Sequence, residues 1–341
     1  MNQTQDLHPE INALAPAVLS LVKQAHSILL HCHPSPDPDS VCSALAMKFV
    51  LEKMGKHAVV IQGDSKLPPA FEHFPGAGDI VRQNFFEIDH KEFDLFISLD
   101  SSTIDRVSNV QPVVFPDYWQ TVNIDHHRTN TRFAQNNLVA DTYPATSQIL
   151  FELFALWGVE MDHDIAANLF VGIYTDTGGL KYRGVSPKTF HIAAALIDLV
   201  PDFSDLISQM ENSNTPGTIA FQALALSHIE TFCNGQLAMS IMTRADLESL
   251  NIKDDDIGTS QISPILRSVI GWDIDVVLFE AETNKIKVGL RTRDAERFDV
   301  SRLAVALGGG GHKAAAGAIL AMSIPAAKEL IVEKVKELYN L

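Results

Sequence analysis

The chain has 341 residues, which is enough for two domains and too many for one ordinary core. Hydrophobic residues make up 46% of it and charged residues 20%, and no apolar run reaches the ~18–20 residues that a membrane-spanning helix needs. The formal net charge of −16 argues against binding of long nucleic acids, whose affinity comes from many phosphate contacts, but it permits a short nucleotide held by a few local cations.

The beginning of the chain and its cysteines indicate where the protein works. The stretch MNQTQDLHPE has neither a basic start nor an apolar core, so we expect no signal peptide. The three cysteines, Cys32, Cys42 and Cys233, are not spaced as a zinc ribbon. They indicate a reduced protein without a disulfide framework, and we therefore expect a cytoplasmic location.

The first part of the chain alternates predicted strands and helices. Short apolar runs that end in polar residues predict strands over 27–32, 57–62, 93–101 and 121–127. Apolar stripes at helical spacing predict helices over 40–55, 146–158, 163–179 and 186–200, the last with Ser186 as its N-cap. Strands that alternate with helices favour a mostly parallel sheet flanked by helices.

The pattern changes after residue 200, where we place an interdomain linker over 199–228, partly helical. Strands are predicted over 236–244, 273–281, 285–293 and 318–320, the middle two joined as a hairpin, with helices over 299–307 and from Pro325 onward. The predicted fold class is α/β. A larger domain (1–198) carries the mostly parallel sheet, a smaller α/β domain (229–341) carries a mixed sheet, and the active-site cleft is expected between them.

The stretch HCHPSPDPDS crowds histidines, aspartates and prolines between a strand and a helix. A residue that precedes proline is pushed toward extended geometry, so this loop should be stiff. A plain capping turn would use Asp39 or Ser40 as the helix N-cap. Capping does not explain one histidine and two aspartates on a stiff loop, so His33, Asp37 and Asp39 are candidate metal ligands.

Three other polar motifs follow apolar segments. Asp100 ends the strand FDLFISLDS at the edge where ligands bind in open α/β sheets, although a lone aspartate there is also common as a helix cap. Asp125, His126 and His127 end another strand, and alternation of side chains lets one metal take either histidine easily but rarely both. In GIYTDTGG, Asp176 ends a helix beside glycines, as a ligand or as a solvated helix end.

The stretch GGGGHKAAAG is the second strong signal. Its glycines, which include Gly309, Gly310 and Gly311, expose backbone N–H groups that can hold a phosphate-sized anion. His312 and Lys313 add donors and positive charge. A glycine run is often only a flexible loop, but the small residues that follow favour tight packing around this one.

The candidate ligands together comprise four carboxylates and two imidazoles: His33, Asp37, Asp39, Asp100, His126 and Asp176. Nearly all belong to the expected carboxyl edge of the sheet. The negative charge of four aspartates balances the positive charge of two divalent cations. Oxygen-rich ligation with some imidazole suits Mn²⁺ or Mg²⁺. Two metals ~3.5–4 Å apart can generate a hydroxide and clamp a phosphoryl oxygen. We expect two divalent cations per chain, Mn²⁺ in preference to Mg²⁺.

The motifs resemble those of the DHH phosphoesterase family with its DHH-associated C-terminal domain. The resemblance covers most of the chain and rests on five motifs in the family order: HPSPDPD (33–39), SLDSS (98–102), DHH (125–127), GIYTDTGGLKY (172–182) and GGGGHKAAAG (308–317). Within the family, the chain most resembles the short two-domain members that act on short oligoribonucleotides (nanoRNA) and on 3′-phosphoadenosine 5′-phosphate.

The resemblance also implies roles for the candidate residues. His33 and Asp37 would hold one cation, the other three ligands would hold the second, and Asp100 would bridge the two. His127 would contact the scissile phosphate, so His127 and Asp100 are the expected catalytic residues. A water activated by two metals would attack phosphorus in line.

The second domain is expected to bind the substrate. His312 and the glycine loop would do so in the family, Arg291 in VGLRTR matches a strand arginine that relatives carry near the substrate, and Lys313 could attract the anion. At two positions, Cys42 and Leu180, the sequence departs from the residues that are usual in the family. Neither departure removes a ligand, and both bear on substrate preference.

Alternative functions stay open at this point. They are a phosphodiesterase for cyclic di-adenylate or linear dinucleotides, an inorganic pyrophosphatase, and a non-catalytic nucleotide sensor. The expected partners are short nucleotides or oligoribonucleotides, with no long nucleic acid and no membrane. A homodimer is one option for the oligomeric state, which the sequence leaves open.

Overall fold

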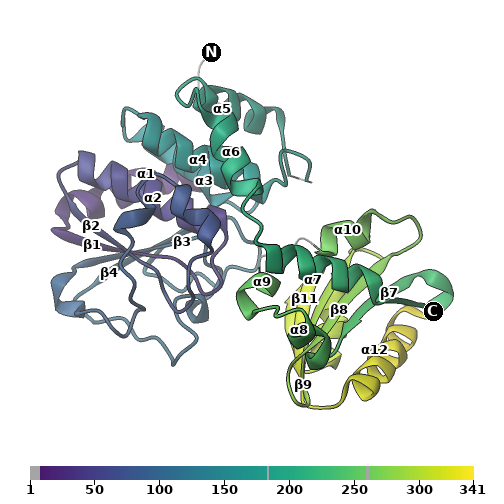
Figure 1. The fold of residues 1–341 in the computed structure, drawn as a ribbon. Helices are drawn as coiled ribbons and strands as arrows, with labels where there is room; N and C mark the ends of the chain where they lie inside the picture. Colours follow the sequence, from purple (N-terminus) through teal and green to yellow (C-terminus); the bar gives the residue numbers. More distant parts are fainter. Residues whose placement is uncertain (1–7, 183, 259–261) are drawn as a thin grey trace. The chain divides into compact units, whose positions relative to one another are not determined.

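The computed structural model describes residues 8–182, 184–258 and 262–341 (Figure 1). The chain forms two compact units, Met1–Ser213 and Asn214–Leu341. The division lies inside the stretch 199–228 that we expected to be a linker. Much of that stretch is helical, with α6 (Phe203–Glu211) before the division and α7 (Pro216–Ser227) after it.

The first unit contains a five-stranded sheet in the order β2-β1-β3-β4-β5, in which every pairing is parallel. Its strands are β1 (Ser27–His31), β2 (His57–Ile61), β3 (Leu95–Leu99), β4 (Gln120–Asp125) and β5 (Asn136–Val139). The prediction of a mostly parallel sheet is confirmed. The edge strand β5 was not predicted, because half of its short sequence is polar and only Leu138 and Val139 are buried.

Five helices of this unit accompany the sheet: α1 (Pro9–Gln24), α2 (Pro38–Lys53), α3 (Thr146–Leu156), α4 (His163–Asp176) and α5 (Pro187–Ile197). Short 3₁₀ segments lie in the connections: η1 (Pro69–His73), η2 (Ala77–Asp79), η3 (His90–Glu92) and η4 (Ile104–Arg106). Helix α1 was not predicted, although its buried residues Ile11, Ala15, Val18 and Val22 follow helical spacing. Ser186 caps α5, as predicted.

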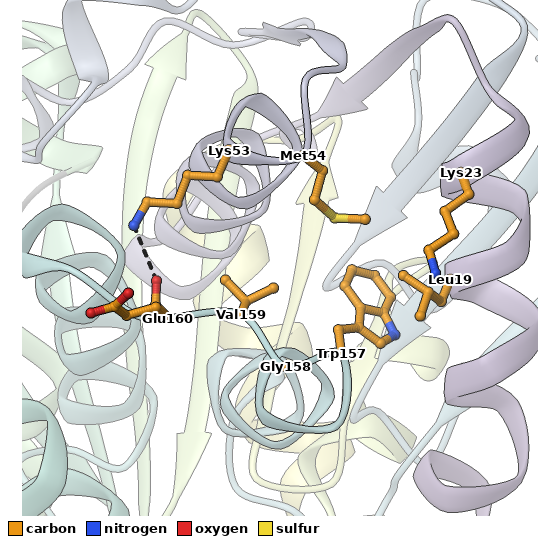
Figure 2. Close-up of a pocket in the computed structure, with 8 residues that line it drawn as sticks. All are labelled: Leu19, Lys23, Lys53, Met54, Trp157, Gly158, Val159 and Glu160. Carbon is orange, nitrogen blue, oxygen red and sulfur yellow. Dashed lines mark hydrogen bonds between the residues drawn. The ribbon is translucent and has the colours of Figure 1, made fainter.

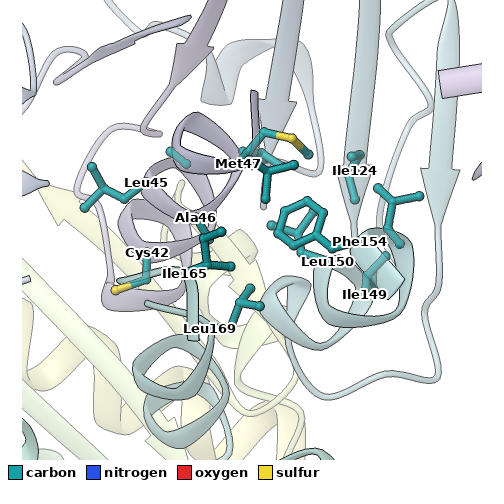
Figure 3. Packing of buried hydrophobic residues seen from close by; sticks show 14 of the residues in the cluster. Cys42, Leu45, Ala46, Met47, Ile124, Ile149, Leu150, Phe154, Ile165 and Leu169 are labelled. Atoms are coloured by element: carbon teal, nitrogen blue, oxygen red, sulfur yellow. The ribbon is translucent and has the colours of Figure 1, made fainter. Parts of the chain in front are cut away.

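Helix α2 lies at the centre of the first core. Most of its side chains are buried on every face, which is typical of a helix enclosed by other elements. Figure 3 shows its residues beside those of α3, α4 and β4, among them Ala46, Leu150 and Leu169. Because this packing fixes α2, its N-terminal turn is a rigid support for the side chains that it carries.

The second unit contains a six-stranded mixed sheet in the order β10-β11-β9-β8-β7-β6. Its strands are β6 (Ile229–Phe232), β7 (Leu237–Met242), β8 (Ile274–Glu282), β9 (Lys285–Thr292), β10 (Gly310–His312) and β11 (Ala315–Leu320). β7 and β8 are parallel and the other neighbours are antiparallel. The predicted mixed sheet and the β8–β9 hairpin are therefore confirmed.

Helices of the second unit cover two hydrophobic clusters of their own. Besides α7, they are α8 (Arg244–Ser249), α9 (Asp254–Gly258), α10 (Ile262–Ser268), α11 (Val300–Ala306) and α12 (Ile324–Tyr339), and a short 3₁₀ segment, η5 (Cys233–Gly235), precedes β7. Leu303 of α11 and Ile331 of α12 are fully buried against strand residues such as Leu290. Among the described residues, no helix combines the length and the apolar character needed to cross a membrane.

Candidate metal centre

The carboxyl edge of the parallel sheet brings the six predicted ligands together. Two sets of three residues have candidate ligand atoms within 4.8 Å of one another: His33, Asp37 and Asp100, and Asp39, His126 and Asp176. A further set of Asp100, His126 and His127 connects them. In a parallel sheet the strand ends meet at one edge, so residues that follow β1, β3 and β4 converge with the start of α2 and the end of α4.

The first set is built around His33. Its Nε2 atom lies 3.5 Å from Oδ2 of Asp37 and 3.6 Å from Oδ2 of Asp100. Its Nδ1 atom lies 3.0 Å from the carbonyl oxygen of Pro34. A carbonyl oxygen can only accept a hydrogen bond, so in this contact Nδ1 carries a proton, and Nε2 is the ring nitrogen that faces the two carboxylates. A histidine whose Nδ1–H is held by a carbonyl oxygen would bind a cation through Nε2.

The second set is built around His126 in the same way. Its Nε2 atom lies 3.3 Å from Oδ1 of Asp100 and 3.2 Å from Oδ2 of Asp176. Its Nδ1 atom lies 3.1 Å from the carbonyl oxygen of Tyr143, which again assigns the proton to Nδ1. Both imidazoles therefore offer Nε2 to the carboxylates.

Asp100 lies between the two histidines and is 2% exposed. One oxygen faces His33 and the other faces His126, and the hydroxyl of Thr146 donates to Oδ1 at 3.0 Å. Its backbone φ of 56° is in the left-handed region, which a residue with a side chain rarely adopts. Such conformations cost energy and concentrate at functional sites. The backbone N–H is held by the carbonyl of Ile124 at 3.0 Å.

The capping prediction for the first motif was wrong. Asp37, not Asp39 or Ser40, is the N-cap of α2, and its carboxylate accepts from the backbone N–H of Ser40 at 2.9 Å. The helix begins at Pro38 because proline lacks an N–H and suits the first helical turn. Asp37 thus has two contacts: it caps α2 and it faces His33.

Asp39 instead binds the beginning of another helix. Its carboxylate accepts from the backbone N–H groups of Thr146 at 2.7 Å and Ser147 at 3.1 Å, at the N-terminus of α3. The hydroxyl of Ser147 donates to it as well, at 2.5 Å. A Cβ atom at Gly172 of α4 would collide with both Ser147 and Asp39, so glycine is required there for close approach.

The centre concentrates negative charge away from water. Burial, with the neighbouring Asp100 carboxylate, raises the pKa of Asp39 to about 7. Burial, with the Asp39 carboxylate, raises the pKa of Asp176 to about 8. Burial alone would lower the pKa of His33, but its hydrogen bonds with Asp100 and Asp37 raise it to about 10. Crowded oxygen donors with imidazole Nε2 atoms therefore fit hard divalent cations such as Mn²⁺ or Mg²⁺.

His127 is positioned by a buried carboxylate. Its Nδ1 atom lies 2.7 Å from Oδ1 of Asp125, whose other oxygen accepts from Nδ2 of Asn130 at 2.6 Å. The strand was expected to continue to His127, but β4 ends at Asp125, so both histidines follow the strand. The two rings lie 4.5 Å apart, and Nδ1 of His127 lies 3.7 Å from Oδ1 of Asp100.

Several residues of the centre were missed by sequence reasoning. Thr146 and Ser147 were only the beginning of a predicted helix, Gly172 was only part of a motif, and Asn130 and Arg106 had no assigned role. Threonine and serine at a helix start are a recognisable signal for capping. The sequence does not reveal that the carboxylate at this start comes from α2.

The predicted substrate residues of the second unit lie around β9 and β10. Arg291 of β9 is half-buried, pairs in register with Asp275 of β8 and Ala315 of β11, and donates to the carbonyl oxygens of Leu290 and Ala316 at 2.9 and 3.4 Å. Lys313 is exposed, with its Nζ atom 3.7 Å from a carboxylate oxygen of Glu296.

The expectation of a glycine loop needs correction, because β10 is an edge strand of the sheet. A Cβ atom at Gly309 or Gly311 would collide with β11, so these two glycines let the strands approach closely. Gly310 has open space at its Cβ position. The backbone of His312 belongs to β10, while its side chain lies outside the described part of the structure.

Residues other than the six ligands line two surface cavities of the first unit. One, of about 440 Å³, lies between α1, the end of α2 and the segment after α3, with Lys53 donating to the carbonyl of Glu160 at 3.0 Å (Figure 2). The other, of about 650 Å³, lies beside β2 and includes Phe71 and Arg82.

Comparisons with known proteins agree with the motifs. Residues 27–173 match the DHH family, N-terminal domain, and residues 252–340 match the DHHA1 domain. The bifunctional oligoribonuclease and PAP phosphatase NrnA of Thermus thermophilus is 29% identical over 314 residues, which are 91% of this chain and 89% of that protein. The protein of the same name from Bacillus subtilis is 23% identical over 302 residues, 86% of this chain and 88% of that protein.

Solved structures share the fold. An exopolyphosphatase-related protein from Bacteroides fragilis has a TM-score of 0.88 at 23% identity, and the match covers 97% of this chain and 98% of that one. RecJ from Thermus thermophilus, in complex with Mn²⁺, has a TM-score of 0.53 at 15% identity, over 98% of this chain and 56% of that one. From its two matched domains and the relatives that span nearly its whole length, we conclude that the chain belongs to the DHH family and carries a DHHA1 domain.

Proposed function

We propose that the protein is a metal-dependent phosphoesterase that hydrolyses short oligoribonucleotides and 3′-phosphoadenosine 5′-phosphate. The observation that carries the proposal is the shared Asp100, which faces both His33 and His126 and so joins two three-residue sets of hard ligands. Family membership supports phosphoester hydrolysis. The names of the relatives, oligoribonuclease and PAP phosphatase, support the substrate class.

The proposed centre holds two divalent cations, with Mn²⁺ preferred. His33 and Asp37 would bind one cation and Asp39, His126 and Asp176 the other, with Asp100 in contact with both. Bound cations of this kind lower the pKa of water and neutralise charge on phosphoryl oxygens. Both imidazoles donate from Nδ1–H to a backbone carbonyl, His33 to Pro34 and His126 to Tyr143, and this orients the rings so that Nε2 would bind a cation.

His127 is proposed to contact the scissile phosphate. Burial would lower its pKa, but the hydrogen bond with Asp125 and the charge of Asp100 raise it. A raised pKa favours the imidazolium, whose Nε2–H can donate to a phosphoryl oxygen while Nδ1–H stays bound to Asp125. Such a donor is most useful where negative charge grows during reaction.

The second unit is proposed to contribute the rest of substrate binding. Arg291, Lys313 and His312 would supply positive charge and donors, and the backbone of Gly309, Gly310 and Gly311 would supply N–H groups. The open space at Gly310 supports a close approach of a ligand to the strand. These roles apply to short substrates only, because the net charge of −16 opposes a long nucleic acid.

A substrate panel tests the proposal. Purified protein, first stripped of metal and then supplied with Mn²⁺, is incubated with 3′-phosphoadenosine 5′-phosphate, a diribonucleotide, linear and cyclic di-adenylate, and pyrophosphate. We expect phosphate release from the first and mononucleotides from the second. Asp100→Asn should abolish both activities, whereas Asp141→Asn, which changes an exposed aspartate, should not.

The outcomes separate the alternatives. Preference for linear or cyclic di-adenylate would change the proposed substrate but not the proposed phosphoester hydrolysis. Phosphate from pyrophosphate alone would indicate a pyrophosphatase. Protein that binds Mn²⁺ but hydrolyses no member of the panel would contradict the enzyme proposal and favour a nucleotide sensor.

A further inference from the structure

Arg106 lies directly beside the first cation set, although no sequence motif assigned it a role. It ends η4, the short segment that follows Asp100 and β3. Its Nη2 atom lies 3.1 Å from Nδ1 and 3.4 Å from Nε2 of His33, and the residue is half-buried. The guanidinium therefore rests against the imidazole that presents Nε2 to Asp37 and Asp100.

His33 cannot be the lasting hydrogen-bond partner of this guanidinium. Nδ1 of His33 carries a proton when it donates to the carbonyl of Pro34, so it has no lone pair for Arg106. Nε2 faces Asp37 and Asp100, where a cation would take its lone pair. With the centre loaded, neither ring nitrogen can accept from Arg106, and its donors require another acceptor.

Carboxylates of the described residues do not supply that acceptor. Within residues 8–182, 184–258 and 262–341, no aspartate or glutamate forms an ion pair with Arg106. By contrast, Arg132 in the same unit pairs with Glu10. A guanidinium is permanently charged, and its planar donors match the oxygens of a phosphate. An unpaired guanidinium at a cluster of acids is therefore placed for an anion that comes from outside the chain.

The charges of the centre lead to the same conclusion. The four carboxylate ligands balance the charge of two divalent cations, which leaves the loaded set near neutral. Arg106 then adds one positive charge at the side of His33. A phosphodiester carries one negative charge and a phosphomonoester up to two, so the guanidinium offsets charge that the cations and ligands leave uncompensated.

We propose that Arg106 binds the non-bridging oxygens of the substrate's phosphoryl group at the cation set of His33, Asp37 and Asp100. This inference rests on the proposed function, since it concerns the same phosphoester. Arg106 acts as a substrate-binding residue of the first unit, and its forked donors hold the phosphate in one orientation against the cations.

The test uses Arg106→Ala and Arg106→Lys in the full chain, with Arg82→Ala as the matched control, because Arg82 is an exposed arginine of the same unit. We expect Arg106→Ala to lower kcat/KM by about 10²-fold, as for loss of one donor to a developing oxyanion. Arg106→Lys should retain part of the kcat/KM that Arg106→Ala loses, and free guanidinium ion should partly restore the activity of the alanine variant. Mn²⁺ affinity, measured by titration, should change less than about threefold, a readout that separates substrate binding from support of His33.

Binding of inorganic phosphate to the Mn²⁺-loaded protein separates this inference from the proposed function. If the wild type hydrolyses no phosphoester, the proposed function fails, but weaker phosphate binding by Arg106→Ala would still uphold the anion site. Unchanged phosphate binding, unchanged kcat/KM, or a loss of Mn²⁺ affinity that accounts for the whole defect would overturn the inference.

Discussion

Asp125→Asn tests how the structure positions His127. The buried carboxylate accepts from Nδ1–H of His127 through one oxygen and from Nδ2 of Asn130 through the other. The orientation of Asn130 is fixed, because its Oδ1 accepts from the backbone N–H of Arg132 at 2.7 Å and its Nδ2 donates to Oδ1 of Asn123 at 2.8 Å. An asparagine at 125 keeps the shape but has only one oxygen.

The substitution therefore places a donor against a donor. Either the new amide NH₂ faces Nδ2 of Asn130, or it faces His127 and forces the proton from Nδ1 to Nε2. A buried donor without a partner costs about 1–3 kcal/mol. Since 1.4 kcal/mol is a factor of ten, kcat should fall roughly 5- to 140-fold if the cost appears at the reacting phosphate.

Steady-state hydrolysis of 3′-phosphoadenosine 5′-phosphate with saturating Mn²⁺ measures the effect, and histidine NMR reports which ring nitrogen of His127 is protonated. Asp141→Asn, in an exposed aspartate, is the control. A kcat within about twofold of wild type, with the His127 tautomer unchanged, would refute the positioning role of Asp125.

Other predictions concern support of the centre and the second core. Ser147→Ala removes the hydroxyl donor to Asp39 and should weaken Mn²⁺ binding about 10- to 100-fold, measured by titration; unchanged affinity would contradict this. Gly172→Ala forces a collision with Ser147 and Asp39 and should lower the free energy of unfolding by about 1–3 kcal/mol, measured in urea; unaltered stability would show that α4 can shift. Burial raises the pKa of the Asp275 carboxyl to about 6, above that of an aspartate in the unfolded chain. The folded state therefore binds the proton of this carboxyl more tightly than the unfolded chain does. The stability gained in this way is present below about pH 4 and is lost as the pH rises through about 6. Hydrogen-exchange protection of β8, measured against pH, should show this decline in the wild type and a flatter profile in Asp275→Asn. The same pH profile in both proteins would argue against the burial effect.

Much of the fold could be predicted from the sequence because local patterns carry it. Apolar runs predicted four strands of the parallel sheet, and Ser186 before proline predicted the start of α5. The stripe of α1 was equally readable and was overlooked. Strand β5 could not be predicted from the sequence, because half of it is polar and it becomes a strand only by pairing with β4.

The sequence by itself determined which residue types gather at the carboxyl edge. Strands that alternate with helices along the chain predict a parallel sheet, and the residues that follow β1, β3 and β4 lie at the carboxyl edge of such a sheet. Only the tertiary structure decided which of them meet. Asp39 contacts Thr146 across 107 positions of the chain, and Arg106 reaches His33 across 73. Such contacts depend on helix packing and on the backbone conformation of Asp100, which no short stretch of sequence specifies. HPSPDPD predicts ligands, but its partners come from the packing of α2 against α3 and α4.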